Sequence, residues 1–191
     1  MQIRIHRTDG KTGHYTQDDP RRVAMLLQRF DPKRLFRSGP IVIGTLNPFS
    51  ILNPDEICWI EVESEQDTAL LHPEGIEQVQ RLTGRDEYEK LLAQQWPRWR
   101  ANNHHKPGDL LEALVELSFR DGGALYLRAM GYVTEASLVD MVFAAPAITA
   151  TFVPHGTVYI NPKCVVRARL YHSKAEVNYP DGIWVAEADD I

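Results

Sequence analysis

Two Asn-Pro corners, each followed by a run of alternating residues, constrain the fold of this 191-residue chain more than any other feature of its sequence. Asn53-Pro54 precedes the run 57–62, and Asn161-Pro162 precedes the run 165–171, at a spacing of 108 residues. An Asn-Pro pair favours a turn, and the turn sets where the next strand begins. Alternation then determines which face of that strand is buried. The corners therefore predict two strands that bury corresponding positions.

The predicted inward positions of both strands are apolar: Cys58, Ile60, Val62, Val166, Ala168 and Leu170. The predicted outward positions are aromatic or charged: Trp59, Glu61, Arg167 and Arg169. Before each corner come a predicted strand and a segment that can be helical, over 1–7 and 20–30 and again over 124–133 and 135–143. This order favours a duplicated β-α-β-β unit. The alternative is that two similar hairpins arise independently from the small set of turn types.

Between these β-rich ends, the spacing of apolar residues changes to the period of a helix. We expect three helices there, over 73–82, from Asp86 to Pro97 and over 107–121. Another helix over 20–30 is predicted by Asp19 as N-cap and Pro20 at the first helical position. The predicted fold is α+β, with two β-rich lobes of mainly antiparallel strands separated by a three-helix segment.

The expected domains are an N-terminal β-α-β-β lobe over 1–64, a helical segment over 65–121 and a C-terminal β-rich lobe over 122–191, which can also pack as one domain. In the last lobe, Pro180-Asp181-Gly182 predicts a turn between two strands.

The net charge of −5 is distributed unevenly along the chain. Residues 55–95 carry three Lys or Arg against eleven Asp or Glu, whereas residues 1–38 carry nine against four. Because neutralisation of phosphates supplies most of the affinity for nucleic acid, the acidic middle makes nucleic acid an unfavoured partner. A nucleic-acid-binding module that uses the basic N-terminal residues is kept as an alternative.

The two cysteines, Cys58 and Cys164, lie far apart in the sequence and predict neither a disulfide framework nor a zinc or redox motif. No residue spacing predicts a metal site or a phosphate-binding loop. Residues 1–6 alternate, unlike a signal peptide, and no apolar run reaches the roughly 20 residues that cross a membrane. We therefore expect a cytoplasmic protein without a cofactor, a metal or membrane contact.

Aromatic, cationic and histidine side chains form the candidate binding surface. The residues are Trp59, Arg98, Trp99, Arg100, His104, His105 and Trp184. Exposed tryptophan and arginine are typical anchors of a protein interface, and alternating aromatic and cationic groups can also contact nucleic acid. The competing interpretation is that the tryptophans pack inside the protein while the arginines cover apolar surface.

The absence of a complete catalytic motif favours a non-catalytic binding or assembly module, either as a homodimer or with another protein. The main alternative is a small-molecule enzyme with its pocket between the two lobes. In that case His104, His105 or His155 would act with a nearby carboxylate. The sequence leaves both interpretations open.

Overall fold

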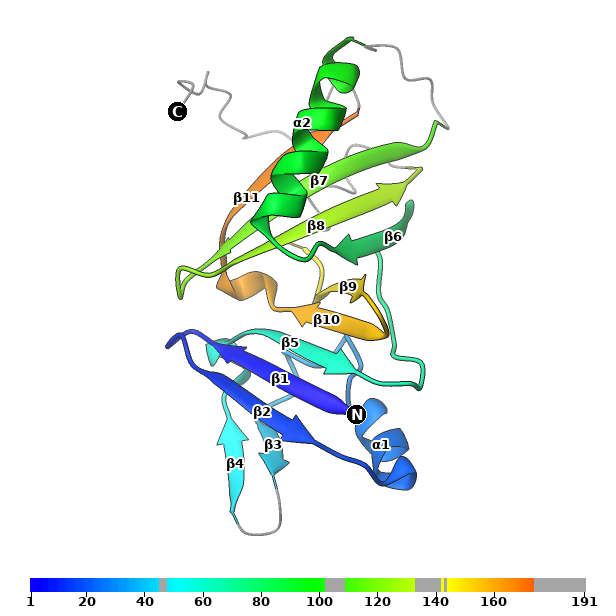
Figure 1. Ribbon diagram of the computed structural model, residues 1–191. Coiled ribbons are helices and arrows are strands. Elements are labelled where there is room, and N and C mark those ends of the chain that lie inside the picture. The colour runs from blue at the N-terminus through cyan, green and yellow to red at the C-terminus, as the bar shows by residue number, and fades with distance from the viewer. Residues whose placement is uncertain (45–47, 102–108, 133–141, 143, 174–191) are drawn as a thin grey trace.

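The structure is a computed structural model, and it describes residues 1–44, 48–101, 109–132, 142 and 144–173. It consists mainly of β-strands (Figure 1). Nine strands form one sheet in the order β11-β7-β8-β6-β9-β10-β5-β1-β2, and β3 and β4 form a separate two-stranded ribbon. Neighbouring strands pair antiparallel except β6 and β9, which pair in parallel.

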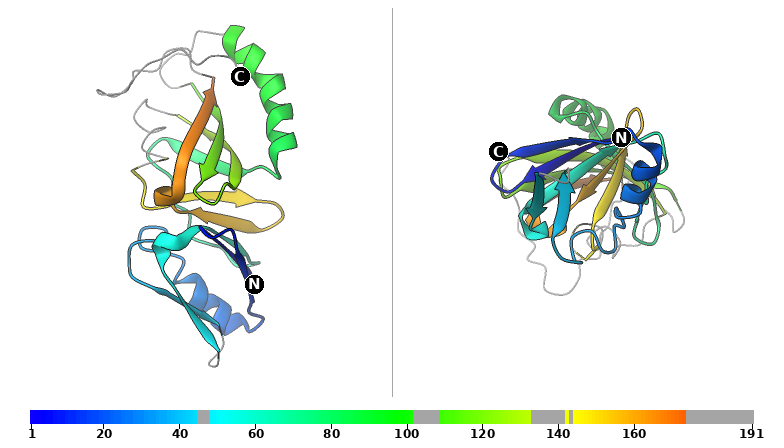
Figure 2. Two further views of the ribbon diagram at one scale, coloured as in Figure 1. Left: turned by 90° about the vertical axis from the view of Figure 1, so that its left-hand side faces the viewer. Right: turned by 90° about the horizontal axis from the view of Figure 1, so that it is seen from below.

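The strands are β1 (Gln2–Arg7), β2 (Thr12–Thr16), β3 (Ile41–Gly44), β4 (Phe49–Leu52), β5 (Ile57–Glu63), β6 (Ile76–Arg81), β7 (Leu111–Phe119), β8 (Ala124–Gly131), β9 (Ile148–Phe152), β10 (Gly156–Ile160) and β11 (Val165–His172). The helices are α1 (Pro20–Leu27), α2 (Arg85–Ala101) and the short 3-10 helices η1 (Pro54–Glu56) and η2 (Pro162–Cys164). Helix α2 lies over one face of β7, β8 and β11, at the end of the molecule opposite to α1, β3 and β4 (Figures 1 and 2). No helix among the described residues is long and apolar enough to cross a membrane.

Two hydrophobic clusters lie on opposite faces of the central strands. Val158 and Ile160 of β10 belong to the first cluster, and Tyr159 between them belongs to the second. The second cluster is also formed by Phe30 and Phe36, which follow α1, and by inward residues of the β3–β4 ribbon. A third, smaller cluster joins α2 to the outer face of β7 and β8.

The predicted α+β fold with a three-helix segment is wrong. Two of the three predicted helices are strands, because 73–82 contains β6 and 107–121 contains β7. The middle one is helical, but α2 continues through Pro97. The earlier helix is present as α1, where the Asp19 side chain accepts hydrogen bonds from two backbone N–H groups.

A β-bulge explains why β6 resembles a helix in sequence. Ile76 and Val79 are three residues apart, which places them on opposite faces of a regular strand. The pairing of β6 with β8 shifts register between Ile76 and Gln78. The extra residue brings both apolar side chains into the first cluster.

Burial on both faces explains the same error at β7. Val115 and Leu117 face the first cluster, whereas Leu114 packs beneath α2 in the third. A strand that is covered on both faces loses the alternation by which a strand is identified. Its adjacent apolar residues then resemble one side of a helix.

The two Asn-Pro corners have the same local structure and pack against each other. Asn53 and Asn161 are each the N-cap of a 3-10 helix, and each side chain accepts a hydrogen bond from the backbone N–H two residues later. The fully buried Asn161 amide also donates to the carbonyl oxygens of Pro54 and Ile57, both at 3.0 Å. The second corner is therefore hydrogen-bonded directly to the first.

The predicted faces of the strands that follow the corners are partly wrong. Val166 is 61% exposed, because the pairing of β11 with β7 shifts register between Val165 and Arg167 and leaves Val166 unpaired. Trp59 and Glu61 of β5, which were expected to face solvent, are only 7% and 4% exposed.

The predicted β-α-β-β unit is also wrong, because two strands precede α1 and two more separate it from η1. The second predicted helical segment, 135–143, lies outside the described residues except for Val142, and so does the turn at 180–182. Strands from all three predicted domains, 1–64, 65–121 and 122–191, pair within the nine-stranded sheet.

Candidate functional site

The β3–β4 ribbon carries three large apolar side chains on a face that is open to solvent. In its register Val42 pairs with Ile51 and Gly44 pairs with Phe49, so these four positions share one face. Val42, Phe49 and Ile51 are 61%, 57% and 64% exposed. We call these three residues the ribbon patch.

The opposite face anchors the ribbon to the body of the protein. Ile41, Ile43 and Leu52 pack against the second hydrophobic cluster. At Gly44 the backbone has φ of +134°, and a Cβ would lie 3.0 Å from the Cα of Phe49, so a side chain there would be strained. The ribbon is therefore apolar on both faces, although only one of them is covered by the described part of the chain.

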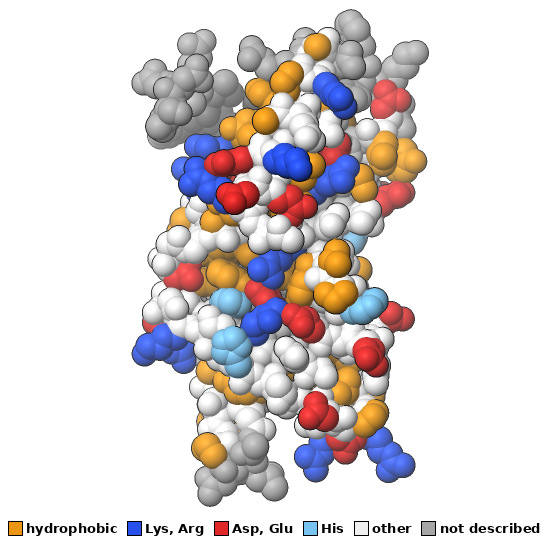
Figure 3. Space-filling model, viewed as in Figure 1, with side chains coloured by type: hydrophobic (Ala, Val, Ile, Leu, Met, Phe, Trp, Pro, Cys, Tyr) orange, Lys and Arg blue, Asp and Glu red, His pale blue; other side chains and the backbone are white. Residues whose placement is uncertain are grey.

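The ribbon strands contain no Asp, Glu, Lys or Arg. In Figure 3 the described part of the ribbon, at the lower left, shows hydrophobic and other uncharged atoms. Within the described ranges β3 and β4 pair only with each other, which leaves one edge of each strand unpaired. Sheets in monomeric proteins usually protect such edges with charges, proline or a covering segment. The ribbon strands have neither a charge nor a proline.

Other strongly exposed apolar side chains lie on separate elements, apart from Leu110 and Tyr132, which are 52% and 53% exposed and flank the paired residues Leu111 and Gly131. Met25 lies on α1, Val153 follows β9, and Val166 lies at the bulge of β11. Single exposed apolar residues are ordinary on protein surfaces. A contiguous group is not, because large exposed apolar patches usually mark binding surfaces. The ribbon patch is such a group.

A second feature is an ion-pair cluster centred on Glu61. Its carboxylate accepts a hydrogen bond from Arg4 Nε at 2.7 Å, and it lies 2.8 Å from an Arg81 terminal nitrogen and 3.2 Å from His6 Nε2. The indole N–H of Trp59 also donates to it, at 3.2 Å. Figure 3 shows histidine and charged side chains together in the middle of this face. The cluster joins β1, β5 and β6.

The electrostatics of the cluster keep Glu61 ionised. Burial by itself raises the pKa of this carboxyl group, but the contacts with His6, Arg81 and Arg4 outweigh it and lower the pKa to about 2. The ring of His6 stacks on Trp59, with their centroids 4.3 Å apart. The polar groups are therefore packed as a defined network.

The cluster also contains a hydroxyl–imidazole–carboxylate series. Thr12 Oγ1 lies 3.1 Å from His6 Nδ1, and the other ring nitrogen of His6 faces Glu61. Such a series can activate a hydroxyl nucleophile. Here two arginines share the carboxylate, so its charge does not act mainly on the imidazole. A groove of about 500 Å³ is lined by residues that include Glu63 and His155, but neither Thr12 nor His6 lines it. The arrangement fits a structural network better than a catalytic one.

Among the described residues of the predicted surface, Trp59 lies in a different cluster from Trp99. Trp59 packs in the first cluster against Phe119, with ring centroids 4.8 Å apart. Trp99 is a half-buried residue of α2 that packs against the third cluster, and Arg98 is exposed on the same helix. For Arg100 only the backbone, within α2, is described, and His104, His105 and Trp184 lie outside the described residues. Their role in binding stays a prediction.

The sequence interpretation missed the ribbon patch. The run Ile41-Val42-Ile43 is fully apolar and predicts a buried strand. What leaves one face open is the pairing of β3 with β4 alone, outside the larger sheet. The available signal was an apolar run without charges, bounded by Gly39-Pro40 and Asn47-Pro48.

Within the described ranges, no group of three or more His, Cys, Asp or Glu residues is placed to hold a metal ion. Comparison with known proteins gave no relative: no protein-family model matches the chain, and no curated protein or solved structure matches it significantly. A proposal for the function of this chain therefore rests on the geometry of its described residues.

Proposed function

We propose that this chain is a non-catalytic, cytoplasmic assembly module that forms a homodimer through the ribbon patch. The observation that carries the proposal is the exposure of Val42, Phe49 and Ile51, each above one half, on one uncharged face. Covering such a side chain contributes about 1.5–3 kcal/mol when its burial is complete. A face of this kind gains free energy by meeting another apolar surface.

A second copy of the chain is the partner that this surface fits best. Two ribbon patches are both apolar and uncharged, so they meet without charge repulsion and without burying an unpaired charge. The net charge of −5 is carried elsewhere on the chain. A partner with a charged surface would lose hydration without gaining an ion pair from the ribbon.

A twofold axis allows the apolar faces of two ribbon patches to cover each other. In an isologous dimer the same patch serves both protomers, so Ile51 of one protomer packs near Phe49 or Val42 of its partner. The contact closes on itself and ends at two copies.

Replacing Ile51 with lysine tests the proposal. Because the variant places a charge in the centre of the apolar contact, we expect dimer affinity to fall at least about tenfold, equivalent to about 1.4 kcal/mol. Sedimentation velocity over a concentration series gives the dissociation constant of each protein.

Val166→Lys is the matched control, since Val166 is 61% exposed against 64% for Ile51 but lies on β11. It should dimerise like the natural protein, and circular dichroism should show the same fold for both variants. A natural protein that stays monomeric at high micromolar concentration would contradict the proposal. Equal weakening by both substitutions would place the interface away from the ribbon.

A further inference from the structure

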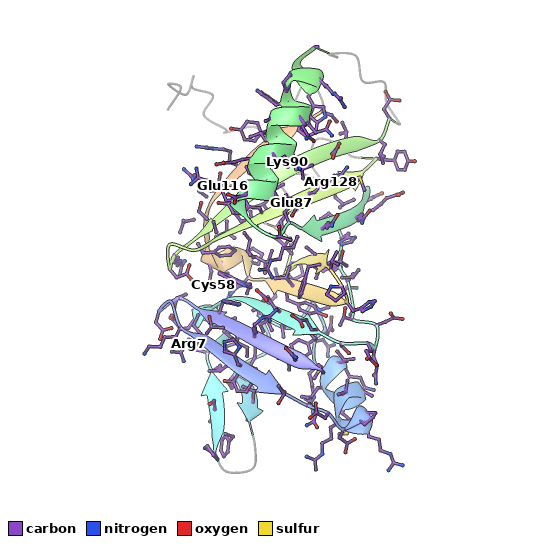
Figure 4. The ribbon with its side chains drawn as sticks, viewed as in Figure 1. Arg7, Cys58, Glu87, Lys90, Glu116 and Arg128 are labelled. Carbon is purple, nitrogen blue, oxygen red and sulfur yellow. The ribbon has the colours of Figure 1, made fainter. Side chains whose placement is uncertain are left out.

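The two cysteines of the chain meet where the Asn-Pro corners pack together. Cys58 is the second residue of β5, and Cys164 is the last residue of η2. Both are free thiols and both are fully buried. Figure 4 labels Cys58 on β5, facing the part of the structure where η2 lies. Two cysteines that are far apart in the sequence therefore lie in the same buried region.

The contacts around the two thiols are close. Cys164 Sγ lies 3.3 Å from the carbonyl oxygen of Ile57, the residue before Cys58. The two cysteine side chains also interact electrostatically, since each one shifts the pKa of the other. The Cys164 thiol is therefore packed directly against the start of β5, where Cys58 lies.

The backbones that carry the thiols are held together as well. The N–H of Asn161 donates to the carbonyl oxygen of Cys58 at 2.9 Å, and the N–H of Cys164 donates to the carbonyl oxygen of Asn161 at 3.1 Å. A disulfide needs Cα atoms within about 7 Å of each other. These two hydrogen bonds, relayed through Asn161, hold the backbone of Cys164 near that of Cys58.

We propose that Cys58 and Cys164 are a redox-sensitive pair that forms an intramolecular disulfide when the protein is exposed to a peroxide. One sulfur attacks a peroxide oxygen, which gives a sulfenic acid and one water molecule. The other sulfur then displaces hydroxide from the sulfenic sulfur, and the hydroxide takes the remaining thiol proton. Two thiols and one hydrogen peroxide thus become one disulfide and two water molecules, and two electrons pass from sulfur to oxygen.

The surroundings make this oxidation slow. Burial raises the pKa of Cys58 to about 12 and also raises the pKa of Cys164, so thiolate is scarce at neutral pH. Neither thiol is exposed, so the peroxide reaches them only when the corners open. The pair therefore responds to prolonged oxidation and is unaffected by brief exposure.

A disulfide here would lock the two corners together. It would close a loop that includes β6 to β10 and α2, and a loop this long restricts the unfolded chain strongly. We expect the melting temperature to rise by about 10 °C on oxidation. Reduction with a dithiol should restore the original value.

The test is peroxide treatment of the natural protein for several hours, followed by denaturation in an alkylating reagent and mass spectrometry. The expected product is a monomeric chain that has lost two hydrogen atoms, carries no alkyl group and yields a linked peptide containing Cys58 and Cys164. Cys164→Ser is the control, and it should show no rise in melting temperature after the same treatment.

Two thiols that still take the alkylating reagent would overturn the proposal, and so would oxidation to sulfinic acid or links only between chains. Mapping the natural protein decides the matter even if the control variant is unstable. The proposal is independent of the ribbon patch, since Ile51→Lys should form the same disulfide.

Discussion

At the scale of single residues, Glu61 shows what the sequence could and could not predict. Alternation along 57–62 identifies the strand and its two faces, but it predicts that Glu61 faces solvent. The carboxylate is instead buried, and one of its partners, Arg81, comes from a strand 20 positions further along the chain. A contact between strands that are not neighbours in the sheet leaves no periodic signal in a single sequence.

Replacing Glu61 with glutamine should destabilise the protein by about 2–4 kcal/mol, because it leaves Arg4 and Arg81 without their shared counter-charge. The natural protein should lose stability in acid. The pKa of this carboxyl group is 4.5 without these contacts and about 2 in the folded protein, so protonation favours the unfolded chain. Its contribution is complete above about pH 4.5 and disappears as the pH falls toward 2.

Urea unfolding at several pH values measures both effects. The glutamine variant should lose less stability than the natural protein between about pH 4.5 and pH 2. Glu65→Gln is the control, because Glu65 is exposed, and its effect should stay within about 0.5 kcal/mol. A Glu61 variant that behaves like this control would show that the ion-pair cluster does not stabilise the fold.

At the scale of elements, the turn signals predicted structure better than the apolar spacing did. Both Asn-Pro corners adopt the same capped 3-10 turn, which local side-chain chemistry determines. Apolar spacing failed at β6 and β7, where a bulge and burial on both faces imitate a helix. Local chemistry is readable in one sequence, whereas bulges and double burial depend on neighbouring strands.

The two corners provide a matched pair of variants. Asn53→Ala removes only a cap at an exposed position and should lower the free energy of unfolding by about 1 kcal/mol. Asn161→Ala removes the corresponding cap of η2 and two buried hydrogen bonds to the first corner. It should therefore lower the free energy of unfolding by about 3 kcal/mol.

Chemical unfolding of the two asparagine variants under identical conditions gives the comparison. Equal losses of stability would mean that the hydrogen bonds between the corners contribute nothing beyond the caps. A larger loss in Asn53→Ala would contradict the structural difference between the two positions.

At the scale of the whole molecule, the nine-stranded sheet contains every described strand except β3 and β4, which form a separate ribbon. The ribbon is fixed to the body by one apolar face and presents the other to solvent. The apolar run Ile41-Val42-Ile43 predicts a short strand but not its separation from the larger sheet, because strand pairing is a property of the folded whole. That separation exposes residues that would otherwise be core, and the proposed assembly surface rests on it.

Hydrogen–deuterium exchange at increasing protein concentration tests this account most directly, because it locates the contact as well as detecting it. We expect the amides of Ile41–Gly44 and Phe49–Leu52 to exchange more slowly as concentration rises, while those of α2 stay unchanged. The same series on Ile51→Lys should show no slowing. Ribbon amides that exchange at one rate across the series, or slowing confined to α2 and β11, would contradict assembly through the ribbon.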